Sequence, residues 1–187
     1  MIAVTQMRQN RRSVVFGLAG LGIGHALLQG SSAMAETPSS QGYVLGPAGG
    51  EHLVHYRNTG HIFIKAGPVK GSKNLACGTQ QVPVGAGIPM HIHFEADEAF
   101  YILEGSGTFI LDDARIPFEK GGTIFIPKNS WHGFANPDQE LLLLWIVTPA
   151  GLDSFFRETC SPPDVAPKKW TKEQINEIAR KYATQYK

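Results

Sequence analysis

The sequence predicts an all-β domain, a sandwich or a barrel, and two observations carry that prediction. Short apolar runs recur along the chain, and turn-forming residues separate them. The 21 glycines and 12 prolines are spread between these runs, and no long helical periodicity occurs before Gly151. Such spacing is typical of many short strands that pair through turns.

The expected strands share a high content of β-branched, aromatic and aliphatic residues. They cover Tyr43–Leu45, Ile62–Ala66, Leu75–Val84, Glu98–Leu103, Thr108–Leu111, Thr123–Ile126 and Leu141–Thr148. Turn signals such as Glu104-Gly105-Ser106-Gly107 and Asn136-Pro137-Asp138 divide them.

The segment after Gly151, residues 151–187, is expected to be helical. Leu152–Glu158 favours a short helix, and Thr171–Tyr186 reads as an amphipathic helix with Thr171 as its N-cap. We interpret the second helix as a packing or dimerisation element.

The first 35 residues have the layout of a cleavable export signal. Three arginines and no acid precede an apolar run from Val14 to Leu28, and Ala33-Met34-Ala35 offers a small-x-small cleavage site. The apolar run is too short to span a bilayer comfortably, so we expect no stable membrane span after cleavage. Residues 36–42, rich in Ser, Pro and Gly, are expected to be a flexible lead-in.

Arg11-Arg12, directly before a weakly apolar and Gly-rich run, resembles a twin-arginine signal. Asn10 and Val14 depart from that pattern, in which Ser or Thr and Phe are usual. The resemblance implies export to the periplasm in the folded state, favoured here over the general secretory route.

Charge and cysteine content set weak limits on partners. Loss of residues 1–35 removes three arginines and no acid, which changes the formal net charge from +1 to about −2. No basic block interleaved with aromatics indicates nucleic-acid binding. Cys77 and Cys160 could form a disulfide in an oxidising compartment or remain two thiols, and their separation in sequence decides neither.

The segment His91-Ile92-His93 is the first candidate for a metal-binding or catalytic site. On a strand, residues i and i+2 share a face, so both imidazoles point the same way. Glu98 follows after a bend at residues 94–97 and is expected to begin a strand that runs back beside the first. His132 stands at the head of a later strand. Three imidazoles and one carboxylate suit a divalent first-row metal.

Both segments resemble the two motifs of the cupin family. Gly85, five residues, His91-Ile92-His93, four residues, Glu98, six residues and Gly105 reproduce the first motif. Gly121, five residues, Pro127-Lys128-Asn129, two residues, His132, three residues and Asn136 reproduce the second. Asn129 replaces the family's glycine, and Asn tolerates positive φ better than other non-Gly residues.

The resemblance implies a single cupin barrel, a double-stranded β-helix or jelly roll, over residues 43–150, followed by C-terminal helices. It implies one divalent transition metal per chain, held by His91, His93, Glu98 and His132. Iron or manganese is favoured because folding before export would precede exposure to copper and zinc, while Ni, Cu, Co and Zn remain possible. Monocupins of this type also commonly form homodimers through a sheet.

Residues beside the ligands predict the lining of a pocket. Alternation from Glu98 places Phe100 and Ile102 on the inward face, and alternation from His132 places Phe134 there. These walls suit a small apolar or aromatic ligand, although each residue also fits an ordinary barrel core. Leu141–Val147 is apolar on both faces, so the orientation of Trp145 stays open.

Three functions fit such a site. Residues 127–156 resemble quercetin-dioxygenase-type monocupins, which implies a dioxygenase that acts with O₂ on a small enolic or phenolic substrate and uses Glu98 as catalytic base. The second function is an O₂-independent lyase, isomerase or decarboxylase in which the metal polarises a carbonyl. The third is a non-enzymatic periplasmic protein that binds metal or a small ligand.

Overall fold

The computed structural model describes residues 42–187. The predicted export signal, and all of the predicted lead-in except Gly42, lie outside the described residues.

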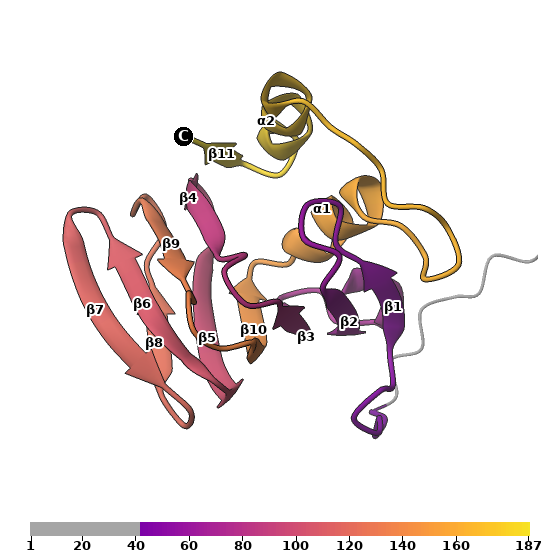
Figure 1. Cartoon of the computed structure of the whole chain (residues 1–187). Coiled ribbons are helices and arrows are strands. Elements are labelled where there is room, and N and C mark those ends of the chain that lie inside the picture. The colour runs from indigo at the N-terminus through magenta and orange to yellow at the C-terminus, as the bar shows by residue number, and fades with distance from the viewer. Residues whose placement is uncertain (1–41) are drawn as a thin grey trace, which may run out of the picture. The chain divides into compact units, whose positions relative to one another are not determined.

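Two antiparallel sheets form the domain, as Figure 1 shows. The six-stranded sheet contains, in spatial order, β1 (Glu51–Val54), β2 (His61–Ala66), β3 (Ala76–Val82), β10 (Leu141–Thr148), β5 (Asp97–Glu104) and β8 (Thr123–Ile126). The five-stranded sheet contains β11 (Thr184–Tyr186), β4 (Ile88–His93), β9 (His132–Ala135), β6 (Ser106–Leu111) and β7 (Ala114–Glu119). The predicted all-β jelly-roll barrel with C-terminal helices is confirmed.

Period-two burial along β10 shows how the core forms. Leu141, Leu143, Trp145 and Val147 are buried, and the residues between them face outward from the six-stranded sheet. Since the alternate residues are also apolar, the sequence could not reveal this phase. The register with β5 places Trp145 opposite Phe100 on the inner face.

Both predicted helices exist, but the second is shorter than expected. α1 (Leu152–Thr159) agrees with the prediction, and α2 (Lys172–Arg180) begins with the predicted Thr171 cap, which forms a capping box with Gln174. The prediction of helix as far as Tyr186 is wrong. The chain turns at Ala183, where φ is 48°, and then forms β11 beside β4. A single-turn 3₁₀ helix at Pro68–Lys70 completes the elements.

Two strand predictions are also wrong. Tyr43–Leu45 is not a strand, and its tyrosine hydroxyl donates to the Lys65 carbonyl at 2.7 Å. The strand that contains Glu98 does not run beside the His91–His93 strand, because residues 94–96 carry the chain from the five-stranded sheet to the six-stranded one. The bend was expected, but its destination depends on pairing with β10 and β8, which are distant in sequence.

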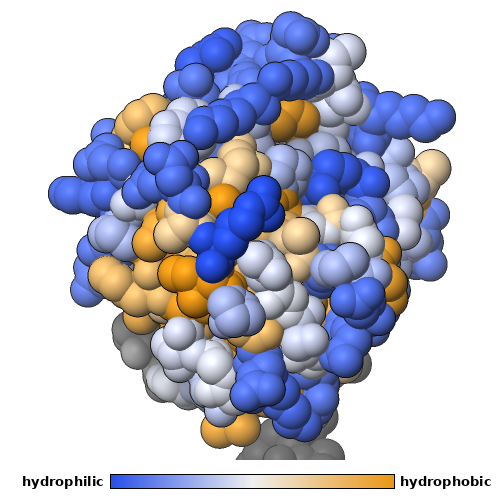
Figure 2. Space-filling view, turned by 60° about the vertical axis from the view of Figure 1, so that its left-hand side comes forward, coloured by the Kyte–Doolittle hydropathy of each residue, from blue (hydrophilic) through white to orange (hydrophobic). Residues whose placement is uncertain are grey.

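The surface mixes polar and apolar side chains. Figure 2 shows hydrophobic side chains among hydrophilic ones on the side that it turns forward. Cys77 and Cys160 are free thiols in the structure. Among residues 42–187, no helix is long and apolar enough to cross a membrane.

Candidate metal centre

The structure brings together all four predicted ligands. His91 and His93 come from β4, Glu98 from β5 and His132 from the first position of β9. One ligand atom from each residue lies within 4.8 Å of the others, and all four side chains are buried. The antiparallel register pairs His91 directly with His132, which explains why residues 41 positions apart in the chain meet.

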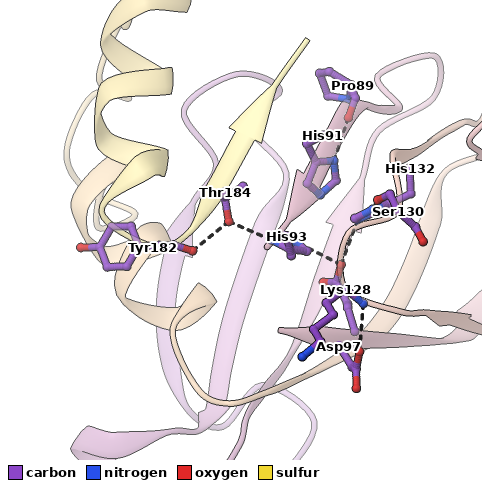
Figure 3. Close-up of polar contacts among 10 residues, drawn as sticks. Pro89, His91, His93, Asp97, Lys128, Ser130, His132, Tyr182 and Thr184 are labelled. Atoms are coloured by element: carbon purple, nitrogen blue, oxygen red, sulfur yellow. Dashed lines mark hydrogen bonds and ion pairs between the residues drawn. The ribbon is translucent and has the colours of Figure 1, made fainter. Parts of the chain in front are cut away.

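Hydrogen bonds at Nδ1 fix the tautomers of the histidines. The Nδ1 atoms of His91 and His132 lie 2.9 Å from the carbonyl oxygens of Pro89 and Ser130, as Figure 3 shows. A carbonyl oxygen only accepts, so each Nδ1 carries the proton and each Nε2 keeps its lone pair.

The third histidine is fixed by the C-terminal strand. His93 Nδ1 lies 2.8 Å from Thr184 Oγ1, which itself donates to the Tyr182 carbonyl at 3.0 Å. Because the only hydroxyl proton of Thr184 is used by Tyr182, Thr184 Oγ1 accepts from His93 Nδ1–H (Figure 3). All three imidazoles therefore present Nε2 to the same point.

The buried atoms at that point lack hydrogen-bond partners. Glu98 Oε2 lies 3.3 Å from both His93 Nε2 and His132 Nε2, and among the described residues none of these three atoms has a hydrogen-bond partner. Buried lone pairs that face one another are costly. A divalent cation would satisfy all of them at once, so this donor set fits a single metal ion.

Charge at the centre also favours a cation. Burial alone would raise the pKa of Glu98, but His132 and His93 outweigh it and hold that pKa below its ordinary value. Burial, with contributions from His132 and His93, lowers the pKa of His91 well below its ordinary value. The centre therefore offers a carboxylate and a neutral His91 imidazole.

A cavity of about 30 Å³ adjoins His91 and Glu98. Its wall combines aromatic and polar side chains, namely His55, Tyr56, Arg57, Gln80, Ile88, His91, Glu98, Phe100, Trp145, Leu152, Phe156 and Tyr186. Phe100 is the predicted pocket residue that lines this cavity. Ile102 and Phe134 are buried in the core and are not among the lining residues. Alternation placed Ile102 on the correct face, but it stands four residues from Glu98, roughly 13 Å along the strand.

Several residues around the centre escaped the sequence analysis. His55 is buried beside the cavity, and its Nδ1 accepts from the Arg57 backbone N–H at 3.1 Å. Thr184 and Tyr186 fell inside the expected helix. Their alternation on β11, opposite His93 and His91, would have been the signal had a strand been expected there.

Comparisons with known proteins agree with this fold. The Cupin domain profile matches residues 78–148, which include all four ligands. A solved RmlC-like cupin from Shewanella frigidimarina superposes with a TM-score of 0.52 at 17% identity, over 62% of this chain and 99% of that one. Residues 78–148 therefore match the Cupin domain model, and the described fold is a cupin-like one with a buried three-histidine, one-glutamate cluster that suits a metal ion.

Two curated proteins are similar over shorter segments. An uncharacterized protein from Methanocaldococcus jannaschii is 42% identical over 55 residues, which cover 29% of this chain and 44% of that protein. Quercetin 2,3-dioxygenase from Bacillus subtilis is 29% identical over 80 residues, which cover 43% of this chain and 24% of the enzyme. The matches span less than half the length of either relative.

Proposed function

We propose that the protein is a metal-dependent dioxygenase that acts on a small enolic or phenolic substrate. The observation that carries this proposal is the convergence of three Nε2 atoms and the Glu98 carboxylate beside a cavity. His91, His93, Glu98 and His132 would hold the ion, which would supply Lewis-acid chemistry toward a substrate or O₂.

Glu98 has the position and charge for a general base. Its Oε2 belongs to the ligand cluster, and the residue also lines the cavity. A carboxylate at this place can accept the proton of an enol or phenol hydroxyl that enters the cavity. Phe100, Trp145 and Phe156 provide an aromatic wall that limits access of water to the same region.

The similarity to quercetin 2,3-dioxygenase supports the use of O₂, although it covers only a quarter of that enzyme. The cavity argues for a smaller substrate than a flavonol. A volume of about 30 Å³ is far below the roughly 300–1,000 Å³ of pockets that enclose drug-sized ligands. We therefore expect a substrate with few heavy atoms, or one that inserts only its reactive oxygens.

Aerobic and anaerobic turnover by metal-loaded protein tests this proposal. A panel of small enols, phenols and keto acids should show consumption only with O₂, and both His132→Ala and Glu98→Gln should abolish it. Turnover of the same substrate without O₂ would instead indicate a lyase, isomerase or decarboxylase. Absence of any turnover at full metal occupancy would indicate a binding protein.

A further inference from the structure

The cavity has a second polar wall that the metal centre does not use. Tyr56 and Arg57 reach it from the connection between β1 and β2, and Tyr186 reaches it from β11. These residues come from opposite ends of the domain's sequence, and no motif that predicted the metal ligands includes them.

Arg57 is held in place without being neutralised. Its Nη1 donates to the Ala86 carbonyl and its Nη2 to the Gly87 carbonyl, both at 3.2 Å. Asn136 fixes this loop in turn, since its Oδ1 accepts from Gly87 N–H at 2.8 Å. Within residues 42–187, Arg57 forms no ion pair with a carboxylate. A positive charge therefore stands at the cavity wall with its orientation already set.

The neighbouring groups are hydrogen-bond donors as well. Trp145 Nε1 is buried and has no partner among the described residues. An indole N–H can only donate, and the tyrosine hydroxyls and the Gln80 amide can also donate. Glu98 is the only carboxylate among the lining residues, and it belongs to the metal centre. The rest of the cavity wall therefore favours a ligand that carries several hydrogen-bond acceptors.

We propose that the cavity binds a small organic anion with two oxygen functions. One, a hydroxyl or enol oxygen, faces the metal centre, and the other, a carboxylate, is held by Arg57 with help from Trp145 Nε1–H. A guanidinium binds carboxylates through paired, charge-assisted hydrogen bonds, which makes this residue the specificity determinant. This inference rests on the proposed function, because that function places the first oxygen at the metal centre. The expected ligand is then a small hydroxy or enol acid and not the apolar or aromatic molecule that the sequence predicted.

Lactate and lactamide form a matched pair of probes, because they share the hydroxyl and differ in the carboxylate. Calorimetric titration of zinc-loaded protein at low ionic strength should show lactate bound at least tenfold more tightly than lactamide, because only lactate brings a negative charge to the Arg57 guanidinium. Arg57→Gln should remove that preference, so that lactate and lactamide bind with similar affinity. Arg115→Gln, at an exposed arginine on β7, is the control and should retain it.

Elemental analysis of each sample separates the two proposals. Loss of zinc from wild-type protein would count against the metal centre. Full zinc with equal affinity for both probes, or with no affinity for either, would overturn the anion site. The comparison of the probes on wild-type protein stands even if Arg57→Gln does not fold, and Arg57→Lys, which keeps the charge but not the paired geometry, should show an intermediate preference.

Discussion

Thr184 joins the C-terminal strand to the metal centre through one hydroxyl. That hydroxyl accepts from His93 Nδ1–H at 2.8 Å and donates to Tyr182 at 3.0 Å. Because it selects the His93 tautomer with a free Nε2, it acts as a positioning residue.

Thr184→Val should therefore weaken metal binding about 10- to 100-fold, as loss of such supporting hydrogen bonds commonly does. The shape is almost unchanged, so any deficit reflects the hydroxyl. Competition between the protein and a zinc chelator measures the effect, and Thr184→Ser should restore most of the affinity. Equal affinity in Thr184→Val and wild-type protein would show that this hydrogen bond does not position His93.

His55 makes stability depend on pH. Burial, assisted by nearby Arg57, lowers its pKa to about 3 from the ordinary value of 6.5. As the pH falls, the unfolded chain protonates this histidine before the folded protein does. The contribution of neutral His55 to the free energy of unfolding is therefore fully present above pH 6.5 and is lost as the pH falls toward 3. The loss is at most about 1.4 kcal/mol per pH unit.

Urea unfolding of metal-free protein at several pH values from 7.5 downward measures this dependence. His55→Gln replaces the imidazole by a group that does not titrate, so its stability should fall less steeply than that of wild-type protein. Parallel losses in the two proteins would mean that His55 titrates normally in the folded state.

The metal ligands were predictable because their chemistry is encoded locally. His91, His93 and Glu98 lie within eight consecutive residues, and the pattern that includes His132 has fixed spacing. Thr184 and Arg57 were not predictable, because Thr184 contacts a residue 91 positions away and Arg57 contacts carbonyls 29 and 30 positions away. Only the folded topology brings these groups to the centre.

At the level of elements, the turn between β8 and β9 delivers His132. Asn129 lies in this turn with φ of 66°, and its backbone N–H donates to the His93 carbonyl at 2.7 Å. Lys128 N–H donates to Asp97 Oδ1 at 2.9 Å. The turn is thus tied to both other ligand-bearing strands, and the expectation that Asn129 would adopt positive φ in place of glycine agrees with this geometry.

Replacing Asn129 by a β-branched residue should strain the turn. Asn129→Val is expected to destabilise the protein by about 1–3 kcal/mol, because positive φ is costly for such a side chain. Asn129→Gly serves as the matched control and should unfold at nearly the wild-type urea concentration. If both variants unfolded together, the backbone at this position would not require left-handed geometry.

The C-terminal strand shows where pattern analysis of elements fails. A helical period relates four apolar residues, Ile175, Ile178, Ala179 and Tyr182. This period continues past Arg180, so it does not predict that the helix ends there. The helix ends there because three residues of β11 pair with the edge of β4. Pairing with a distant edge strand is a tertiary effect that local periodicity does not contain. The β10 and β5 strands, which carry strong local patterns, were predicted within two residues.

For the whole molecule, we propose a homodimer formed through the outer face of the six-stranded sheet. Neighbouring strands align Ile146, Ala99 and Phe125 in one row on that face, and Leu144 and Tyr101 in the next. Phe125 is 63% and Tyr101 44% exposed. An apolar surface that spans three strands is typical of a protein interface. In a two-fold symmetric dimer, the same apolar face of a second copy would pack against it.

Light scattering of residues 36–187 at micromolar concentration should give twice the chain mass. Phe125→Glu should shift it to a monomer, because the dimer would bury two charges without partners. Ile116→Lys changes another exposed hydrophobic residue, on β7 in the other sheet, and should leave the dimer intact. A monomer mass for the wild-type protein would refute the proposal.

The route of export and the identity of the metal are linked in one further proposal. Residues 1–35 resemble a twin-arginine signal, and the resemblance implies that the chain crosses the membrane after folding. Raw affinity at nitrogen and oxygen ligands favours Cu²⁺ and Zn²⁺ over Fe²⁺ and Mn²⁺, and nothing in three imidazoles and a carboxylate reverses that order. The four ligands are buried, so a metal acquired during folding would leave slowly. Folding in the cytoplasm would thus let the compartment select iron or manganese.

Two variants test this link. Changing Arg11-Arg12 to Lys-Lys should hold the protein in the cytoplasm, and replacing residues 1–35 by a general secretory signal should make it fold in the periplasm. Elemental analysis should find iron or manganese in the wild-type protein and copper or zinc in the variant with the general signal, because only the latter forms its centre where the stronger binders compete freely. The same metal delivered by both signals would show that the place of folding does not select it.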